Sequence, residues 1–574
     1  MQSLPAPFLP LPQLGRFSVA LLLLASCDLV ASQLELTSFR VRGDAGVSLN
    51  ATTGWAAAER EGARIAYDEP FRLRVEVEAG EARSEELRLE YRKRGGKWHP
   101  IGLSRFPYPL YATPEISIIE AEAFTFGEET EDVLTGALSE HEEGLGLSGL
   151  QVTPLFHLSG QSIEWEWPLV LRRFYDGPGF NEDETQFEVR VVDRRGKRLR
   201  GLRSIVLTGY APDGHLGGTF IETPSRIGPY QTSSGRLYFL MEPTESDNRF
   251  MVVASDDGGR NWREVDGSGR PSTGDLEGVG AAFYEGVIHI LHQTSDAVFY
   301  HAFATDNAAR SKDRWLVDSE VVDTPDEPPT QSASLAALPD GRLVAVYGGA
   351  TGGFVKIRDG DGLWQQGPQR LETSAIGNLS GFEVAAGAGG EAFIAYTARD
   401  GTGWFRTLDA GGVLSKPHQL SSRLGRSEEE HCSILPVTVL PCGSPVFIYR
   451  EVDGRLFERR WATKGKLTEA VLIPTSRVAT GVVDSDQVGA DVVQHGGQLH
   501  LLYIDEASHS INYATTGNDG RWTDTGPLIG KIDAAWVRGT IIHDPEGAAA
   551  YGFVYDAGSQ GGAGMNSYSS LPLK

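Results

Sequence analysis

Cysteine, basic residues and long apolar segments are all scarce in this chain of 574 residues. With only three cysteines, the protein has to build its hydrophobic cores without a framework of disulfides. The 52 basic residues are outnumbered by 77 acidic ones, and the formal charge of -25 would repel nucleic acid and anionic membrane surfaces. No second hydrophobic segment follows the apolar run near the start of the chain. These shortages exclude nucleic acid as a partner and a mature chain that spans a membrane.

Several chemical signatures are also missing from the sequence. It has no Gly-x-Ser-x-Gly elbow, no phosphate-binding loop and no dinucleotide fingerprint, so we expect no cofactor. His289, His292 and His301 are close in sequence, but residues i and i+3 of a strand face opposite sides, so the first two are not expected to share a metal ion. We therefore predict no metal site in this chain.

Glycine and aromatic residues, by contrast, are abundant. The 69 glycines follow neither a collagen period nor a long helical pattern, which is typical of an all-β protein with many tight turns. The 11 tryptophans, 18 tyrosines and 24 phenylalanines are enough to fill large cores. At about 100–200 residues per domain, the length predicts two or three domains.

The first residues have the pattern of an export signal. Arg16 is followed by the apolar run Phe17–Ala25, which has signal-peptide length and is too short to cross a bilayer. The run ends in Leu24-Ala25-Ser26-Cys27, which resembles the lipobox of bacterial lipoproteins, where the cysteine is lipidated. The resemblance implies a signal peptide over residues 1–26 and a protein of the bacterial cell envelope that is lipid-anchored at Cys27. It would face the periplasm or the cell exterior and touch the membrane through the lipid only.

Only Cys432 and Cys442 remain beyond this signal. They flank Ser433–Pro441, which has the pattern of a strand. An extended segment of about ten residues separates its ends by roughly 30 Å, far beyond bridging distance. We therefore expect two free, mostly buried thiols, although a hairpin within this stretch would reverse that expectation.

A first region of alternating strands is predicted over residues 34–209, after a linker over residues 27–33. Segments such as Phe71–Glu78 and Phe187–Val192 alternate apolar and polar residues, which predicts antiparallel strands with one buried face and hence a β-sandwich. Between them, Glu120–Gly149 is rich in glutamate and glycine. We interpret it as a solvated acidic insertion, with a calcium site as the alternative.

The second region, residues 210–574, is repetitive. A glycine followed by a short apolar strand recurs at intervals of 49 to 55 residues. A period near 50 with several strands per unit predicts a β-propeller, in which seven repeats favour seven blades and six are the alternative. Little chain is left for the outermost strand of the last blade, so Ser204–Gly209 is a candidate to close the ring. The repeat glycines are Gly235, Gly286, Gly341, Gly390, Gly443, Gly497 and Gly547.

One turn in the first repeat carries a known motif. The segment Ser255–Trp262 matches Ser-x-Asp-x-Gly-x-x-Trp and resembles the Asp-box of the BNR-repeat, sialidase-like β-propellers. Degenerate versions occur at Asp359–Trp364 and Thr515–Trp522. In that family the box is structural, because its aspartate accepts backbone N–H bonds, its glycine allows positive φ and its tryptophan packs the hairpin. The matching residues are Ser255, Asp257, Gly259 and Trp262.

The sialidase resemblance also implies catalytic residues. Sialidases carry Arg-Ile-Pro near the start of the first blade, and Ser225–Pro229 looks like a version with one inserted glycine. This implies that Arg226 is one of three arginines that bind a substrate carboxylate, and that Asp247, shortly before the Asp-box, is the acid/base. Seven blades depart from the six of true sialidases. The other candidates are chosen by position in the repeat, without a matching motif: Arg450 and Arg538 as further arginines, Tyr555 as nucleophile and Glu383 as its partner.

The repeat itself predicts a ring of polar residues at one mouth of the central channel. If each repeat glycine follows the innermost strand, the residues that enter that strand lie about seven to twelve positions earlier. Arginine binds carboxylates through paired hydrogen bonds, so this mixture of residues indicates a site for an anionic sugar. Packing between blades is the alternative role for the tyrosines. The entry residues are Arg226, Glu277, Gln331, Glu383, His431, Asp486 and Arg538, and the next strands end in His292, Tyr347, Tyr396, Tyr449-Arg450, Tyr503 and Tyr555.

Three functions stay open on these residues. The first is an exported lipoprotein whose propeller binds anionic glycans, with hydrolysis in the manner of an exo-glycosidase left undecided. Its partners would be acidic glycans or cell-surface polysaccharide. The second is a non-catalytic propeller scaffold that binds carbohydrate or protein. The third is a uronate polysaccharide lyase, in which His431 and Tyr449 would serve as base and acid.

Overall fold

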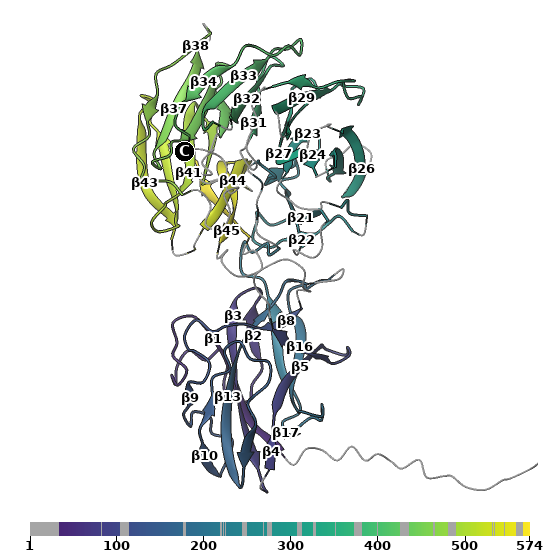
Figure 1. Cartoon of the computed structure of the whole chain (residues 1–574), viewed down its shortest axis with the longest axis vertical. Helices are drawn as coiled ribbons and strands as arrows, with labels where there is room; N and C mark the ends of the chain where they lie inside the picture. The colour runs from purple at the N-terminus through teal and green to yellow at the C-terminus, as the bar shows by residue number, and fades with distance from the viewer. Residues whose placement is uncertain are drawn as a thin grey trace, which may run out of the picture.

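The protein is all-β. The computed structural model describes residues 34–573 except 82, 104–113, 176–178, 219–220, 222, 224, 244–248, 268, 273–277, 295, 307–312, 325–328, 350–351, 372–381, 399, 425–435, 463–464, 480–488, 531, 533, 545 and 558–565. All elements assigned within these ranges are strands, and none of the described residues form a helix long and apolar enough to cross a membrane. The predicted fold class, a β-sandwich followed by a β-propeller, is confirmed (Figure 1).

Two sheets form the N-terminal sandwich. Apolar side chains from both sheets, such as Val75, Trp167 and Leu207, fill one core between them. One sheet runs in the order β17 (Arg200–Gly201), β1 (Leu34–Gly43), β3 (Pro70–Ala79), β13 (Gln161–Leu171), β8 (Ile116–Ile118) and β7 (Gly102–Leu103), with β10 (Glu140–Glu142) also paired to β13. The other runs in the order β2 (Ala63–Ala66), β18 (Ile205–Tyr210), β16 (Thr185–Asp193), β5 (Leu87–Lys93) and β6 (His99–Pro100).

The charged face of β3 is buried beneath the acidic insertion, residues 120–149, although most residues of that insertion are themselves exposed or half-buried, as a solvated segment would be. Arg72 and Arg74 are fully buried although they alternate with core residues along β3. The insertion covers them with its own buried residues, among them Thr130, Leu134 and Leu147. It pairs internally through β9 (Glu129–Thr130) and β11 (Gly144–Leu145). A charged outer face of a sheet can be buried only when a covering segment supplies hydrogen bonds, and this insertion does so.

Short two-stranded pairs complete the N-terminal region. They consist of β4 (Arg83–Glu85) with β12 (Phe156–Leu158), and of β14 (Phe174–Tyr175) with β15 (Gly179–Phe180).

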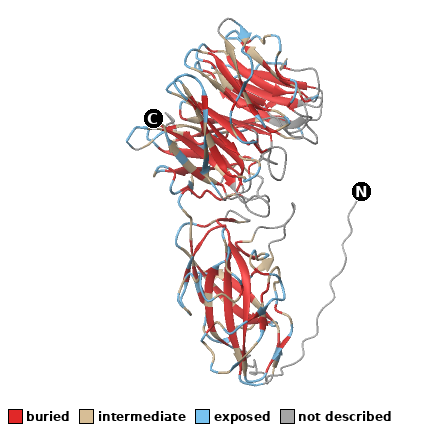
Figure 2. Cartoon of the chain, turned by 90° about the vertical axis from the view of Figure 1, so that its left-hand side faces the viewer, coloured by how far each residue is buried: buried red, intermediate tan, exposed pale blue. Residues whose placement is uncertain are grey.

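Seven antiparallel sheets follow in chain order among the described residues, and their first strands pack against one another around the centre of a ring (Figure 1). Figure 2 shows that the inner strands of these sheets, like the central strands of the sandwich, are buried along most of their length. The outermost strands are exposed or half-buried along most of theirs. The first sheet runs in the order β19 (Tyr230–Gln231), β20 (Leu237–Met241), β21 (Met251–Ser255) and β22 (Arg263–Glu264), and the second in the order β23 (Val279–Tyr284), β24 (Val287–Gln293), β25 (Val298–Ala304) and β26 (Arg314–Asp323). The third runs in the order β27 (Pro329–Ala337), β28 (Leu343–Gly349), β29 (Gly352–Arg358) and β30 (Gln369–Arg370). The fourth runs in the order β31 (Phe382–Ala386), β32 (Ala392–Thr397), β33 (Gly403–Leu408) and β34 (His418–Ser421).

The remaining three sheets complete the ring. The fifth runs in the order β35 (Val437–Val439), β36 (Pro445–Arg450) and β37 (Leu456–Ala462), and both β38 (Lys466–Leu467) and β39 (Val471–Leu472) pair with β37. The sixth runs from β40 (Ala490–His495) through β41 (Gln498–Ile504) and β42 (Ile511–Thr516) to β43 (Trp522–Ile529). The seventh consists of β44 (Ala534–His543), β45 (Ala549–Ala557) and β46 (Ser567–Pro572).

The repeat glycines have one structural role. All seven lie in the turn between the first and second strands of a sheet, and their φ angles fall between 80° and 88°. This left-handed conformation is open to glycine without the steric cost that a Cβ atom brings. The prediction that each repeat glycine follows the innermost strand is confirmed.

The closure of the last sheet differs from the prediction. Residues 204–209 were expected to complete it, but they fall largely in β18, which pairs with β16 and β2 of the sandwich. Instead, the N–H of Tyr568 donates to the Gly214 carbonyl at 2.8 Å, and the N–H of Leu216 donates to the Asn566 carbonyl at 2.8 Å. The chain just after the sandwich therefore joins β46.

Cys442 also departs from the prediction. It lies in the turn between β35 and β36 and is a free, exposed thiol rather than a buried one. The segment before it is not one extended strand, because β35 covers only Val437–Val439. Cys432 lies outside the described residues.

Candidate functional site

A pocket of about 380 Å³ opens on the first strands of the propeller sheets. Its wall is formed by β23, β27, β31 and β35, and the segment that leads into β19 contributes Arg226 and Tyr230. Glu383 of β31 also lines it. The first strands of a propeller surround its axis, so this pocket lies where the sequence placed a ligand site.

Strand alternation aims Glu383 at the pocket. Its neighbour Phe382 is fully buried in the hydrophobic core between the third and fourth sheets, so the next side chain points away from that core. The entering segment is fixed separately, because the hydroxyl of Ser225 donates to the Ala333 carbonyl at 2.6 Å. Two elements far apart in sequence thus bring Arg226 and Glu383 to one cavity.

Arg226 is held by a carboxylate from across the ring. Its Nη2 donates to Asp491 Oδ1 at 2.6 Å and to the Val492 carbonyl at 2.8 Å. Asp491 lies on β40, is fully buried, and accepts further hydrogen bonds from the N–H of Gly539 at 2.8 Å and the hydroxyl of Tyr551 at 2.9 Å. Asp491 is therefore the centre of a polar network that links three sheets.

A second arginine belongs to the same network. Arg538 of β44 donates through Nη2 to Glu383 Oε1 at 3.3 Å, and its Nη1 lies 3.9 Å from Asp491 Oδ1. We call Arg226, Glu383, Asp491, Arg538 and Tyr551 the central cluster. With all groups ionised except the tyrosine, its two guanidinium groups balance its two carboxylates.

Burial changes how these groups titrate. Burial raises the pKa of Glu383, and the positive charges of Arg538 and Arg226 offset part of that effect. Burial also raises the pKa of Tyr551 well above its usual value, and Asp491 adds to the shift. Burial alone would lower the pKa of Arg226, but Asp491 and Glu383 raise it overall. Glu383 therefore takes up a proton at a higher pH than an ordinary glutamate, and its protonation would leave the cluster with a net positive charge.

Arg450 lies in a different environment. Its Nε donates to the Val478 carbonyl at 2.6 Å, and its Nη2 lies 3.9 Å from Glu506. These contacts join the fifth sheet to the sixth. The predicted triad thus has two members, Arg226 and Arg538, on the central cluster, while Arg450 takes part in packing between sheets.

The tyrosines predicted at the mouth are mostly packing residues. Tyr449 is almost fully buried, and its ring stacks on Phe457 with the centroids 5.8 Å apart. Tyr555 packs against Phe553 with a centroid separation of 6.1 Å. The hydroxyl of Tyr347 donates to Asp323 at 2.6 Å, as that of Tyr503 does to Asp524 at 2.9 Å.

Several predicted residues cannot be placed. Asp247, Glu277, His431 and Asp486 lie outside the described residues, as does Cys27. Gln331 lies in β27, and its side chain is not described.

The Asp-box has the geometry of a structural turn. The hydroxyl of Ser255 accepts from the N–H of Gly259 at 2.9 Å, and Asp257 Oδ1 accepts from the N–H of Asn261 at 2.9 Å. Gly259 has a φ of 94°, and a Cβ there would overlap the ring of Tyr568. Trp262 is buried against that same ring. The box therefore fixes a hairpin onto the last sheet and does not enter the central pocket.

Sequence reasoning missed Asp491 and Tyr551. Asp491 lies six residues before Gly497, one position outside the range of seven to twelve residues that predicts strand entry. Tyr551 lies four residues before Tyr555 in β45, and because side chains alternate along a strand, both lie on the same face. A range that is one residue wider includes Asp491, an acidic residue between Ala490 and two valines in β40.

Comparisons with known proteins identify similar folds only. No family model and no curated protein matches the chain. Among solved structures, AofleA from Arthrobotrys oligospora is 12% identical with a TM-score of 0.36, and the match covers 62% of this chain and 95% of that one. The Aleuria aurantia lectin, in complex with Fucalpha1-6GlcNAc, is 10% identical with a TM-score of 0.35, and the match covers 56% of this chain and 99% of that one. A thermostable family-43 glycoside hydrolase is 16% identical with a TM-score of 0.26, over 42% of this chain and 89% of that one. At these values the similarity carries no argument about ligand or activity.

Proposed function

We propose that the propeller binds acidic glycans in the central pocket, with Arg226 as the group that receives a sugar carboxylate. The observation that carries the proposal is the position of Arg226, whose side chain is 22% exposed and lines the pocket beside Glu383. The volume of about 380 Å³ falls in the range of about 300–1,000 Å³ that is usual for small-ligand sites.

The hydrogen bonds of Arg226 support a carboxylate as the ligand group. Nη2 is committed to Asp491 and to the Val492 carbonyl. Among the described residues Nη1 has no hydrogen-bond partner, so it is left to donate into the pocket. An arginine held rigidly by its own carboxylate is pre-organised, which lowers the entropy cost of binding a second anion.

The charge of the pocket also fits an acidic ligand. When Glu383 is protonated, the central cluster carries one positive charge more than it carries negative charges. A ligand carboxylate would restore the balance inside a site of low dielectric, where such pairing is strong. This local charge stands against the acidic surface of the rest of the chain.

Binding without cleavage is the form of the proposal that the packing supports. Hydrolysis in the sialidase manner needs a tyrosine activated by a neighbouring carboxylate. Tyr555 packs on Phe553, and Glu383 pairs with Arg538. Tyr551 does donate its hydroxyl to Asp491, but its side chain is fully buried and does not line the pocket. These partners favour the non-catalytic alternative over the exo-glycosidase, and Tyr449 is likewise buried in a core rather than available to a lyase.

We further propose that the protein is exported and lipid-anchored at Cys27 in the bacterial cell envelope. The support is the order of Arg16, the apolar run and the lipobox-like Leu24–Cys27. Replacing Cys27 with serine should release the protein from the membrane fraction. Retention of the variant in membranes would contradict the anchor.

The experiment that tests glycan binding compares two arginine variants of the full chain. We expect Arg226→Gln to abolish binding to carboxylated glycans on a panel that also holds their neutral counterparts. Arg521→Gln, at a side chain that is 89% exposed, is the control and should bind like the parent. Mass spectrometry of the same glycans should find them unchanged. Absence of binding to every glycan refutes the proposal, whereas products that have gained water or an unsaturated uronate would show catalysis instead.

A further inference from the structure

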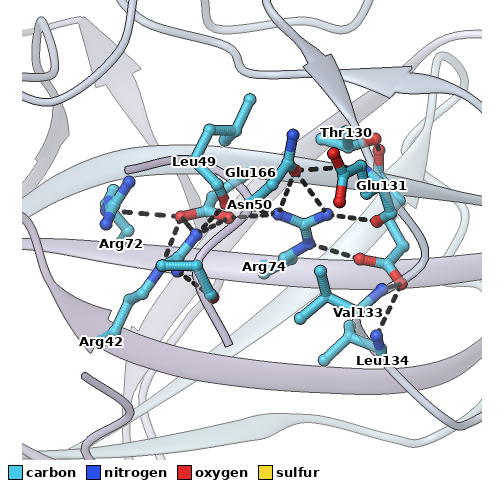
Figure 3. Close-up of polar contacts among 12 residues, drawn as sticks. Arg42, Leu49, Asn50, Arg72, Arg74, Thr130, Glu131, Val133, Leu134 and Glu166 are labelled. Carbon is cyan, nitrogen blue, oxygen red and sulfur yellow. Dashed lines mark hydrogen bonds and ion pairs between the residues drawn. The ribbon is translucent and has the colours of Figure 1, made fainter. Parts of the chain in front are cut away.

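The acidic insertion of the sandwich carries a feature that the proposed function does not use. Residues 120–149 contain nine acidic side chains and no lysine or arginine. The insertion lies over the polar face of β1, β3 and β13, where Arg42, Arg72 and Arg74 are fully buried (Figure 3). A segment of this charge attracts cations, and its charge alone does not define a binding site.

Three side chains of different types converge at the edge of this network. Asp132 and His141 come from the insertion, and Glu164 comes from β13. Their candidate ligand atoms all lie within 4.8 Å of one another. Imidazole nitrogen together with carboxylate oxygens is a donor set for borderline divalent metals such as Zn²⁺, whereas Ca²⁺ takes six to eight oxygen ligands.

The ring of His141 provides a second, independent observation. Its Nε2 lies 3.3 Å from the Thr130 carbonyl, an acceptor, so this nitrogen carries the proton. Nδ1 then holds the lone pair, and it is buried without a hydrogen-bond partner. A histidine that binds a metal usually donates its other ring N–H to a carbonyl or carboxylate, which fixes the tautomer in this way. A buried lone pair with no donor is costly, and a metal ion would satisfy it.

Glu164 has room for one more partner. Its Oε1 accepts from the N–H groups of Val133 at 2.9 Å and Leu134 at 2.7 Å, and its Oε2 accepts from Arg74 Nε. Arg74 is shared with Glu166, since Nη1 lies 3.0 Å from Glu166 Oε2 (Figure 3). An approaching cation would therefore meet a guanidinium that is already paired with two carboxylates, of which Glu166 is shared with Arg42 and Arg72.

The geometry points to a Zn²⁺ site formed by Asp132, His141 and Glu164, with water in the remaining position. Metal–ligand distances of about 2.0–2.2 Å in a tetrahedron place ligand atoms about 3.4 Å apart, so the cluster has to contract on binding. Asp132 is exposed on a connecting segment and can move inward. The bound ion would tie the insertion to β13 and would hold the cover of the arginine network in place.

The test is a calorimetric titration of the full chain, freed of metal with a chelator, with Zn²⁺ alone. We expect the parent to show one saturable site per chain. We expect His141→Gln and Asp132→Asn each to bind Zn²⁺ with an affinity at least roughly tenfold lower than that of the parent. His157→Gln is the matched control, because His157 is an exposed histidine of the same domain, in β12. Cys442→Ser controls for the exposed thiol. Both controls should bind like the parent.

Any of the following outcomes would overturn the proposal. It fails if the parent shows no saturable Zn²⁺ binding, if both ligand variants bind like the parent, or if Cys442→Ser loses the site. Ca²⁺ that saturates the site while Zn²⁺ does not would refute the assigned metal class. Since Asp132 is exposed, Asp132→Asn is expected to keep the parent's circular dichroism spectrum even if His141→Gln does not.

Discussion

At the scale of single residues, Asp491 makes the largest contribution to the central cluster. It is fully buried and contacts Arg226, Gly539 and Tyr551. Replacing it with alanine would leave two buried guanidinium groups short of one carboxylate, which typically costs about 3–5 kcal/mol. We expect denaturant unfolding of Asp491→Ala to show a loss of that size. Asp519→Ala, at a side chain that is 63% exposed, should change stability by no more than about 0.5 kcal/mol.

The raised pKa of Glu383 predicts how glycan binding depends on pH. Its pKa is raised by burial, so it gains a proton as the pH falls through a value above the usual 4.5. Below that value the cluster has a net positive charge and binds a ligand carboxylate more tightly. Above it, the ionised Glu383 repels the ligand. We expect affinity for a uronate-containing glycan, measured from pH 8 down to about pH 5, to rise as pH falls, and Glu383→Gln to remove this trend. A rise in affinity toward alkaline pH would contradict the assignment.

The residues of the cluster differ in how far the sequence could predict them. Arg226, Glu383 and Arg538 were predicted because each repeat glycine gives the approximate start of an innermost strand. Which of them pair could not be predicted, since Arg226 and Asp491 are 265 positions apart and meet only after the ring closes. Arg450 instead ends the second strand of its repeat, and it bonds to the Val478 carbonyl, a contact that depends on the packing of two sheets.

At the scale of secondary-structure elements, the repeat glycines allow a matched test. Gly497 has a φ of 86° with nothing near its missing Cβ, so alanine there has space but the wrong backbone conformation. We expect Gly497→Ala to destabilise the protein by about 1–2 kcal/mol in denaturant unfolding. Gly530→Ala is the control, because that glycine has equal space and no positive φ. It should leave stability unchanged or slightly increased. Equal losses in the two variants would rule out backbone strain as the cause.

Secondary-structure elements are predicted well when their structure follows from the residues immediately around them. They are predicted poorly when distant segments determine which of their faces is buried. The turns at the repeat glycines follow from the chain immediately around them. The alternation of β3 is equally local and predicted a polar outward face, but Arg72 and Arg74 are buried because the insertion folds back over them. The acidic composition of the insertion indicated its charge, but it did not indicate that the insertion covers buried arginines.

At the scale of the whole molecule, the sandwich and the propeller meet through buried polar contacts. His215 Nε2 lies 2.8 Å from Asp68 Oδ2, and both residues are buried. Arg173, which is 3% exposed, donates from the sandwich side to the carbonyls of His215 and Trp262. Trp262 belongs to the Asp-box, so the turn that fixes the first sheet to the last also contacts the N-terminal region. This contact gives the motif a structural role that does not involve a ligand.

These contacts predict that Arg173 couples the two parts of the protein during unfolding. Arg173→Met keeps an apolar stem but removes both hydrogen bonds and leaves two buried carbonyls without these donors, at a cost of about 1–3 kcal/mol each. We expect scanning calorimetry of the variant to show two separated transitions, or a wider separation than in the parent. The main core of the sandwich is separate from those of the propeller, although Phe174 and Phe180 of the N-terminal region pack into the propeller's first core. Arg194→Met, at a side chain that is 55% exposed, is the control and should unfold like the parent. If Arg173→Met instead lowers a single transition without splitting it, the two parts unfold together for another reason, and the coupling does not depend on this arginine.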